Sequence, residues 1–309
     1  MRIAFFGTPS FAVPVLNSIL QSGHDTVIAV TRPDRPSGRK MEIKPCPVKE
    51  AALLNSIPVL QPESVKEQSF MDKYREYGAE LNVITAFGQI IPDELIYMPK
   101  YDSINIHASL LPKYRGASPI NHAIMNGDNE TGISFQFIEK RLDAGDIIHS
   151  ASIPISAEDT SITLYEKLSS LAAEHTPRVL ELISSGRAQR IKQDESKAST
   201  VKTLKKEDGR INFSMSAEKI HNMARGLLPW PCAYCTLDSK MLKIMKSSLS
   251  DSTAGSPGEV TASGKNTGFI VRASDKSVVF REVQYEGGKK MNAYDFFLGR
   301  RGLLGKILE

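Results

Sequence analysis

Three polar side chains in the middle of the chain have the chemistry needed to transfer an acyl group. Asn105 and His107 end a run of alternating residues, 103–107, that predicts a β-strand, and Asp143 begins the short turn 143–146. Side chains two residues apart on a strand point to the same face, so the amide and the imidazole are expected to lie together. An amide N–H can stabilise an oxyanion, and an imidazole oriented by a carboxylate can move a proton near neutral pH. The combination predicts acyl transfer without a side-chain nucleophile.

Taken one at a time, these residues have ordinary structural explanations. A single Asn or His at the end of a strand is usually a turn or capping residue, and Asp143 followed by Ala-Gly is a common turn. Asp146 is a second carboxylate in the same turn and an alternative to Asp143. Ser109 also lies nearby, but the sequence around it lacks the G-x-S-x-G elbow that would present it as a nucleophile.

The first 200 residues alternate strand-like and helix-like patterns, which would position these groups. Such alternation is typical of an α/β fold with a doubly wound, mostly parallel sheet, whose strand ends gather functional groups. The expected strands are 2–6, 26–31, 81–85, 103–107, 132–138 and 147–155. The expected helices are 11–20, 48–54, a helix that Ser118 caps with Pro119 in its first turn, and 160–183.

Two common classes of nucleotide-binding enzyme are excluded by missing glycine motifs. The first is judged from the first expected strand–helix turn. It contains a single glycine, Gly7, and so lacks the G-x-G-x-x-G pattern that lets a dinucleotide pyrophosphate approach the helix. The chain also has no Walker A sequence. We therefore expect neither an NAD-dependent enzyme nor a nucleoside triphosphatase.

A polar stretch near residue 190 divides the chain into two expected domains. We predict a catalytic domain over 1–188, a linker over 189–203 with almost no apolar residues, and a C-terminal domain over 204–309. In the last of these, a helix-like pattern precedes short strand-like runs separated by Gly, Ser, Asn and Asp, which favours a small OB-like β-barrel. The helix is 217–226 and the runs are 233–237, 242–246, 258–262, 269–272 and 278–283.

Composition and charge suggest a cytoplasmic protein with a polyanionic partner. The 309 residues are 41% hydrophobic and 24% charged, and no apolar run is long enough to cross a membrane. The three cysteines form no disulfide framework, which suits a reducing compartment. Residues 201–309 carry 18 basic and 11 acidic side chains, a net +7, whereas the first 200 carry a net −3. The basic third could bind nucleic acid, or it could simply be a solvated surface.

Several motifs in order resemble the methionyl-tRNA formyltransferase family over nearly the whole chain. The matching segments are Phe6-Gly7-Thr8-Pro9, the loop 33–39, Ala86-Phe87-Gly88-Gln89-Ile90-Ile91-Pro92, the run 105–112, Leu142-Asp143-Ala144-Gly145-Asp146 and Leu228-Pro229-Trp230-Pro231. The resemblance implies a formyltransferase-like variant of the Rossmann fold with an OB-like β-barrel behind it.

The resemblance also implies an activity and its catalytic residues. The expected reaction moves a formyl group from 10-formyltetrahydrofolate to the α-amino group of methionyl-initiator tRNA, in support of translation initiation. By family correspondence, Asn105, His107 and Asp143 are the catalytic residues, and Asp143 is preferred over Asp146. The donor is already an activated amide, so no metal and no covalent enzyme intermediate are needed. We expect a monomer with no membrane partner.

Two further groups of residues are assigned to binding by the same resemblance. The folate co-substrate is expected to lie along Ser109, Leu110, Leu111 and Pro112, with its pterin ring near Phe87, Gly88 and Ile90. Arg39 and Lys40, in a basic loop after the second strand, are expected to contact tRNA. Relatives commonly continue this loop with basic residues, whereas Met41 and Glu42 follow here. Fewer phosphate contacts should make binding less dependent on salt.

Two other functions remain open at this stage. One is a folate-dependent formyltransferase for a small amine, such as glycinamide ribonucleotide or an amino sugar, although such a substrate does not require a basic C-terminal barrel. The other is an RNA-binding module on an inactive transferase fold, which the retention of all three polar residues disfavours. Cys232 and Cys235 have the C-x-x-C spacing of a metal site, but no second pair accompanies them and no metal site is expected.

Overall fold

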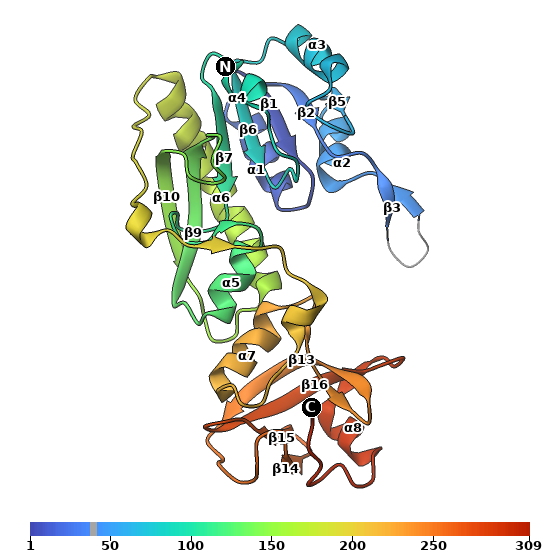
Figure 1. Cartoon of the computed structure of the whole chain (residues 1–309). Coiled ribbons are helices and arrows are strands. Elements are labelled where there is room, and N and C mark those ends of the chain that lie inside the picture. The colour runs from blue at the N-terminus through green and yellow to red at the C-terminus, as the bar shows by residue number, and fades with distance from the viewer. Residues whose placement is uncertain (38–41) are drawn as a thin grey trace. The chain divides into compact units, whose positions relative to one another are not determined.

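The computed structural model describes residues 1–37 and 42–309, which form two compact units (Figure 1). The first unit comprises Met1–Gly116, Thr131–Ile153 and Tyr165–Thr200, and the second comprises Ala117–Glu130, Pro154–Leu164 and Val201–Glu309. The chain therefore passes between the units five times. The sequence pattern had indicated a single passage, within the segment 189–203.

The first unit is built on a seven-stranded sheet. Its strands are β1 (Arg2–Gly7), β2 (Asp25–Val30), β5 (Val59–Leu60), β6 (Leu81–Thr85), β7 (Ser103–His107), β9 (Glu130–Phe137) and β10 (Ile147–Pro154). They lie in the order β10-β9-β7-β6-β1-β2-β5. The pairs β1–β2, β1–β6, β6–β7 and β2–β5 are parallel, and β7–β9 is antiparallel. The prediction of a doubly wound, mostly parallel sheet is confirmed.

Helices alternate with the strands of this unit along the chain. They are α1 (Ala12–Gln21), α2 (Pro47–Leu54), α3 (Gln68–Glu76), α4 (Asp93–Tyr97) and α6 (Ser161–Ser184), the last of which belongs to this unit from Tyr165 onward. The sequence predicted α1, α2 and α6 but not α3 and α4. At the start of α1, the hydroxyl of Tyr165 accepts the Phe11 N–H at 2.7 Å and so caps the helix from another part of the chain.

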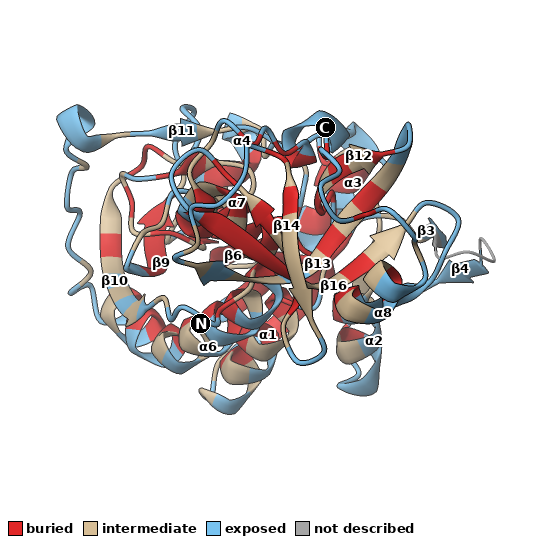
Figure 2. Cartoon of the chain, turned by 90° about the horizontal axis from the view of Figure 1, so that it is seen from below, coloured by how far each residue is buried: buried red, intermediate tan, exposed pale blue. Residues whose placement is uncertain are grey.

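The central strands are buried along their whole length, as apolar runs in a parallel sheet should be. Every residue of β6 is buried, and so are five of the six residues of β1. Figure 2 shows buried residues on the strands and exposed residues on the helices' outer faces. Phe6 on β1 meets the edge of the Phe87 ring at a centroid distance of 5.4 Å and also packs on Tyr74 from α3.

Four shorter strands lie outside the large sheet. β3 (Arg35–Ser37) and β4 (Glu42–Lys44) form an antiparallel hairpin, which we call the basic hairpin. The other two are β8 (Arg115–Gly116) and β11 (Thr200–Val201), and a 3₁₀ turn, η1 (Glu195–Lys197), precedes β11.

The second unit contains the antiparallel sheet that the sequence predicted. It comprises α5 (Pro119–Met125), the 3₁₀ turn η2 (Lys206–Gly209), α7 (Ala217–Gly226), β12 (Ala233–Leu237), β13 (Lys240–Ser250), β14 (Val260–Gly264), β15 (Gly268–Arg272), β16 (Ser277–Tyr285), β17 (Lys290–Asn292) and α8 (Ala293–Leu298). The strand order is β12-β13-β16-β15-β14, with β17 beside β16. Each of the five expected strands is present, whereas β17 and α8 were not predicted.

The last residues of the chain connect the two edge strands of this sheet. The Leu308 N–H donates to the carbonyl of Gly258 at 2.8 Å, just before β14. The Glu309 N–H donates to the carbonyl of Thr236 on β12 at 3.1 Å. The C-terminal segment thereby closes the OB-like barrel, which the sequence pattern gave no reason to expect.

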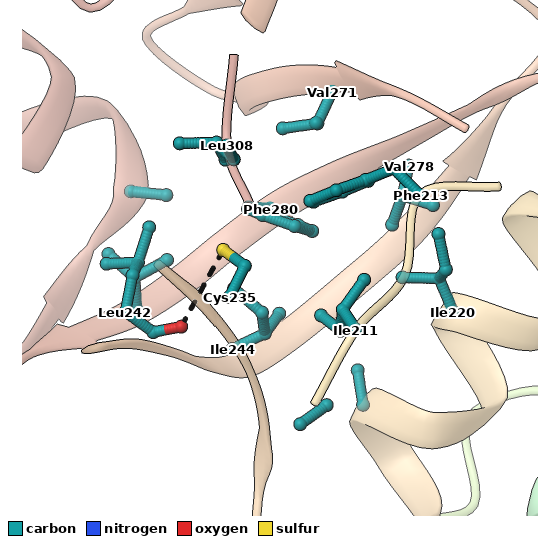
Figure 3. Packing of buried hydrophobic residues seen from close by; sticks show 14 of the residues in the cluster. Ile211, Phe213, Ile220, Cys235, Leu242, Ile244, Val271, Val278, Phe280 and Leu308 are labelled. Carbon is teal, nitrogen blue, oxygen red and sulfur yellow. Dashed lines mark hydrogen bonds between the residues drawn. The ribbon is translucent and has the colours of Figure 1, made fainter. Parts of the chain in front are cut away.

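The core of the second unit is a continuous apolar cluster (Figure 3). Phe269 and Phe280 meet edge to face at a centroid distance of 5.4 Å. Cys235 lies in this cluster with its thiol toward the carbonyl of Leu242, and burial raises the pKa of that thiol to about 12. Cys235 is thus a core residue, while the Cys232 thiol donates to the Pro229 carbonyl at 3.0 Å.

Ser118 corrects one expectation about this unit. It precedes α5, but its backbone is left-handed with φ 59°, and its side chain makes no capping hydrogen bond. A capping serine normally has an extended backbone, which directs its hydroxyl toward the first amides of the helix. Ser118 does occupy the N-cap position and Pro119 the first turn, as predicted, but the expectation that the Ser118 side chain caps the helix was wrong.

Candidate active site

Asn105 and His107 lie at the carboxyl end of β7, which is paired on both sides. Asn105 is opposite Ile84 of the parallel strand β6 and opposite Gln136 of the antiparallel strand β9. His107 is opposite Ser134 of β9. The alternation of β7 and the register of β9 thus bring two further polar side chains beside the predicted pair.

Asp143 reaches the same place from the turn after β9. Its side chain is 9% exposed. One carboxylate oxygen accepts the Gly116 N–H at 2.8 Å, and the other accepts N–H groups from the side-chain amides of Gln136 at 3.0 Å and Asn105 at 3.3 Å. Asp143, rather than Asp146, is therefore the carboxylate that the structure brings to Asn105.

The bonding of His107 fixes which of its ring nitrogens carries a proton. Nε2 lies 2.8 Å from the carbonyl oxygen of Tyr114, and because a carbonyl can only accept, Nε2 must donate. Nδ1 lies 3.6 Å from Oδ2 of Asp143, too far for a hydrogen bond but close enough for charge attraction. The neutral ring therefore has its lone pair on Nδ1, where a proton taken up would face a carboxylate.

The sequence missed two of the donors to Asp143. Gln136 is 2% exposed and stands between the buried Phe135 and Phe137, and a polar residue between two core aromatics was the available signal. Gly116 contributes only its backbone N–H, which no residue type reveals.

The segment expected to line the folate site is held from inside. Ser109 is fully buried and its hydroxyl donates to the Lys113 carbonyl at 2.6 Å. Ser134 from β9 accepts the Leu111 N–H at 3.0 Å and donates to the Ser109 carbonyl at 2.8 Å. Leu110 and Pro112 are partly exposed, and Leu111 is 7% exposed. The Ser109 hydroxyl is thus occupied in fixing the backbone.

The three residues expected near the pterin ring have different environments. Phe87 is 2% exposed and packs on Phe6, so its side chain anchors the segment 86–92 to the core. Gly88 has φ +81°, which side-chain-bearing residues rarely adopt, and it is exposed. Ile90 is 79% exposed. Of these side chains, that of Ile90 is the one open to a ligand.

Arg39 and Lys40, the residues expected to contact tRNA, lie outside the described residues. The basic hairpin that flanks them is held at its base. Asp34, immediately before β3, forms an ion pair with Lys49 in the first turn of α2. Gln61 donates to Asp34 at 2.9 Å and accepts from Lys49 at 2.6 Å. These bonds lower the pKa of Asp34, chiefly through Lys49.

The described residues contain neither a candidate metal site nor a candidate membrane span. Over residues 1–37 and 42–309, no group of three or more His, Cys, Asp or Glu side chains is arranged to hold a metal ion. Within the same residues, no helix has the length and apolar character required to span a membrane.

Comparisons with known proteins agree with the geometry. Residues 1–180 match a family model described as formyl transferase, and residues 203–301 match one described as formyl transferase, C-terminal domain. The chain is similar to methionyl-tRNA formyltransferase from Citrifermentans bemidjiense, with 42% identity over 99% of this chain and 97% of that protein. It is also similar to the protein of that name from Staphylococcus epidermidis, with 41% identity over 99% of each.

Solved structures share the fold at lower identity. Methionyl-tRNA formyltransferase from Clostridium thermocellum has a TM-score of 0.55 and 18% identity, covering 81% of this chain and 94% of that one. An N-formyltransferase from Helicobacter canadensis, solved with folinic acid and dTDP-3-aminofucose, has a TM-score of 0.67 and 20% identity, covering 94% of this chain and 100% of that one.

Proposed function

The chain belongs to the methionyl-tRNA formyltransferase family, and from this we propose that it moves a formyl group from 10-formyltetrahydrofolate to the α-amino group of methionyl-initiator tRNA. The observation that carries the proposal is the meeting of Asn105, His107 and Asp143 at the end of β7, in a chain similar to its relatives over nearly its full length. A formyl carbonyl needs an N–H donor and a nearby proton acceptor, and this cluster offers both.

His107 is the proton acceptor in this proposal. The folate co-substrate supplies the formyl group as an activated amide, so the protein needs to move a proton and stabilise charge. Nε2 of His107 is fixed by Tyr114, which leaves Nδ1 to take the proton of the attacking amine as the new bond to the formyl carbon forms. That proton then passes to N10 of the folate as the bond between the formyl carbon and N10 breaks, so that tetrahydrofolate leaves as a neutral amine. Asp143 stabilises the imidazolium that results, because its carboxylate lies 3.6 Å from Nδ1.

Asn105 is the proposed donor to the charge that develops on the formyl oxygen. Its amide nitrogen carries two hydrogens, and one is directed to Asp143. The second is available to the formyl oxygen. Asp143 therefore orients the donor through a hydrogen bond and acts on the base through its charge.

Binding of the two substrates is proposed on separate surfaces. Leu110, Pro112 and the exposed Ile90 would contact the folate, while the buried Phe87 and Ser109 hold the backbone that carries them. Arg39, Lys40 and the net +7 charge of residues 201–309 would attract the tRNA phosphates.

The test is formylation of methionyl-initiator tRNA by the purified chain and by His107→Ala. Removing the base should lower kcat by about 10²- to 10⁴-fold and leave the Kd for tRNA unchanged. His24→Ala, which removes an imidazole elsewhere in the first unit, is the matched control and should behave as wild type. If wild type formylates glycinamide ribonucleotide or an amino sugar in preference to the tRNA, the proposed acceptor is wrong.

A further inference from the structure

The polar segment before β11 is bonded to the turn that carries Asp143. Gln193, fifty residues away in sequence, donates from Nε2 to the backbone carbonyl of Asp143 at 2.9 Å and to that of Gly145 at 2.8 Å. Its Nε2 also lies 3.3 Å from Oε1 of Gln136, which itself donates to the Asp143 carboxylate. The low apolar content that suggested a linker thus reflects a segment that folds by hydrogen bonding.

The turn itself requires an external restraint. Asp143 has φ +49°, a left-handed conformation that costs a residue with a side chain free energy unless its surroundings impose it. Gly145 is packed so closely that a Cβ there would lie 1.8 Å from the Phe137 carbonyl oxygen. A single amide holding the carbonyls of both residues is suited to maintain this backbone.

Arg115 determines how the Gln193 amide is oriented. The guanidinium donates to Oε1 of Gln193 from Nε at 3.0 Å and from Nη2 at 2.8 Å, and it also pairs with Glu195. Because arginine can only donate, Oε1 must face it, and Nε2 must then face the turn. Arg115 is 6% exposed, and its neighbour Gly116 supplies the N–H that binds the Asp143 carboxylate.

We propose that Gln193 is a positioning residue for the formyl-transfer site, acting on Asp143 through the backbone of the 143–145 turn. Arg115 selects the productive orientation of its amide. The inference rests on the proposed function for the role of Asp143. It goes beyond that function because it assigns a contribution to kcat to a residue that is bonded to the Asp143 turn and is not one of the three proposed catalytic residues.

The test is a double-mutant cycle between Gln193 and Asp143. Its readout is kcat with the acceptor that the wild-type protein formylates. Gln193→Ala should lower kcat by about 10- to 100-fold, the loss expected when a catalytic group moves by up to an ångström, with each KM changed less than about threefold. In an Asp143→Asn background, the same substitution should lower kcat by less than about twofold, since the carboxylate it positions is gone.

Two companion variants separate positioning from general stability. Gln193→Glu keeps the size of the side chain and its pairing with Arg115, but it cannot donate to the two carbonyls. It should therefore lose at least as much kcat as Gln193→Ala, and circular dichroism checks that the variant folds. Lys192→Ala, an exposed neighbour on the same segment, should match wild type.

The outcomes are distinguishable from failure of the proposed function. Absence of formylated methionyl-tRNA with wild type would refute the acceptor, whereas the cycle is scored on whichever amine is formylated. Equal losses from Gln193→Ala with and without Asp143→Asn would overturn the positioning role, as would a Gln193→Glu variant that folds and turns over normally.

Discussion

Two aspartates of the first unit hold polar clusters together, and they use their charge in opposite ways. Asp143 at the proposed active site is bonded by neutral N–H groups from Gly116, Gln136 and Asn105. Asp34 at the base of the basic hairpin is instead paired with the ammonium group of Lys49. The first carboxylate is held by neutral donors, and the second is held mainly by a cation.

The difference fits what each cluster has to do. A carboxylate that stabilises an imidazolium must retain its negative charge toward the ring, so amide donors that hold it without cancelling it are suitable. The guanidinium of Arg115, the residue before Gly116, is directed to Glu195 and Gln193. Asp34 has only to hold the base of the hairpin to α2, and an opposite charge stabilises such a contact most strongly. The neutral donors around Asp143 thus suit the role proposed for it.

The largest loss of kcat is expected from Asn105→Ala, and it tests whether the Asp143 cluster, unlike the Asp34 cluster, serves catalysis. Losing a donor aimed at developing negative charge should lower kcat by about 10²- to 10³-fold, with little change in the KM for either substrate. Steady-state kinetics with tRNA and folate varied separately measure this. Gln61→Ala, which removes an amide from the hairpin cluster, is the control and should leave kcat unchanged. A loss confined to the KM for tRNA would contradict the role of Asn105.

The second prediction concerns protein stability and tests how tightly the turn that carries Asp143 is packed. Gly145→Ala should destabilise the protein by about 3 kcal/mol, since the added methyl would overlap the Phe137 carbonyl at 1.8 Å and the backbone must shift. The midpoint of urea unfolding followed by fluorescence and circular dichroism measures it. Gly264→Ala is the matched control, because its Cβ would meet nothing nearer than 3.4 Å. Equal midpoints for the two variants would show that the turn is not rigidly packed.

The smallest effect is expected at the hairpin base. Lys49→Met should lower stability by about 1 kcal/mol, since the pair is mostly but not fully shielded from solvent. It should raise the KM for tRNA by about fivefold through a less fixed hairpin, with kcat unchanged. Lys66→Met, at an exposed site, is the control. A lowered kcat with an unchanged KM for tRNA would mean that the two aspartate clusters are not functionally separate.

The pH dependence of the stability lost in Lys49→Met tests whether Asp34 is the partner of Lys49. The folded-state pKa of Asp34 is lowered from 3.8, so the stability that the pair contributes is fully present above that pH and is lost as pH falls through the lowered value. The difference in urea midpoint between wild type and Lys49→Met should therefore be constant from pH 7 to 5 and shrink below about pH 3.8. A difference that stays the same at pH 3 would exclude Asp34 as the partner that matters.

Elements with strong apolar patterns were predictable, and weakly patterned ones were not. β6 and β7 were predicted to the residue, because β6 is buried at every position and β7 alternates polar and apolar side chains. α3 was missed because only Phe70, Met71 and Tyr74 are buried in a largely polar helix. The closing role of the C-terminal segment was missed for a related reason. Its backbone bonds to β12 and β14 leave no signature in residue type.

The sequence by itself determined the alternating fold of the first unit, the antiparallel strands of the second, and the three residue types at the proposed active site. Residue chemistry and strand periodicity are local properties, and they can be read along the chain. Only the tertiary structure decided that Gln136, Gly116 and Gln193 hold Asp143, and that Nε2 of His107 carries a proton. Those outcomes depend on the register of β9 against β7, on a backbone amide and on a segment fifty residues away. Local patterns do not specify these contacts, even where, as at Gln136, they mark a residue as unusual, because each contact is fixed by packing between parts of the chain that are distant in sequence.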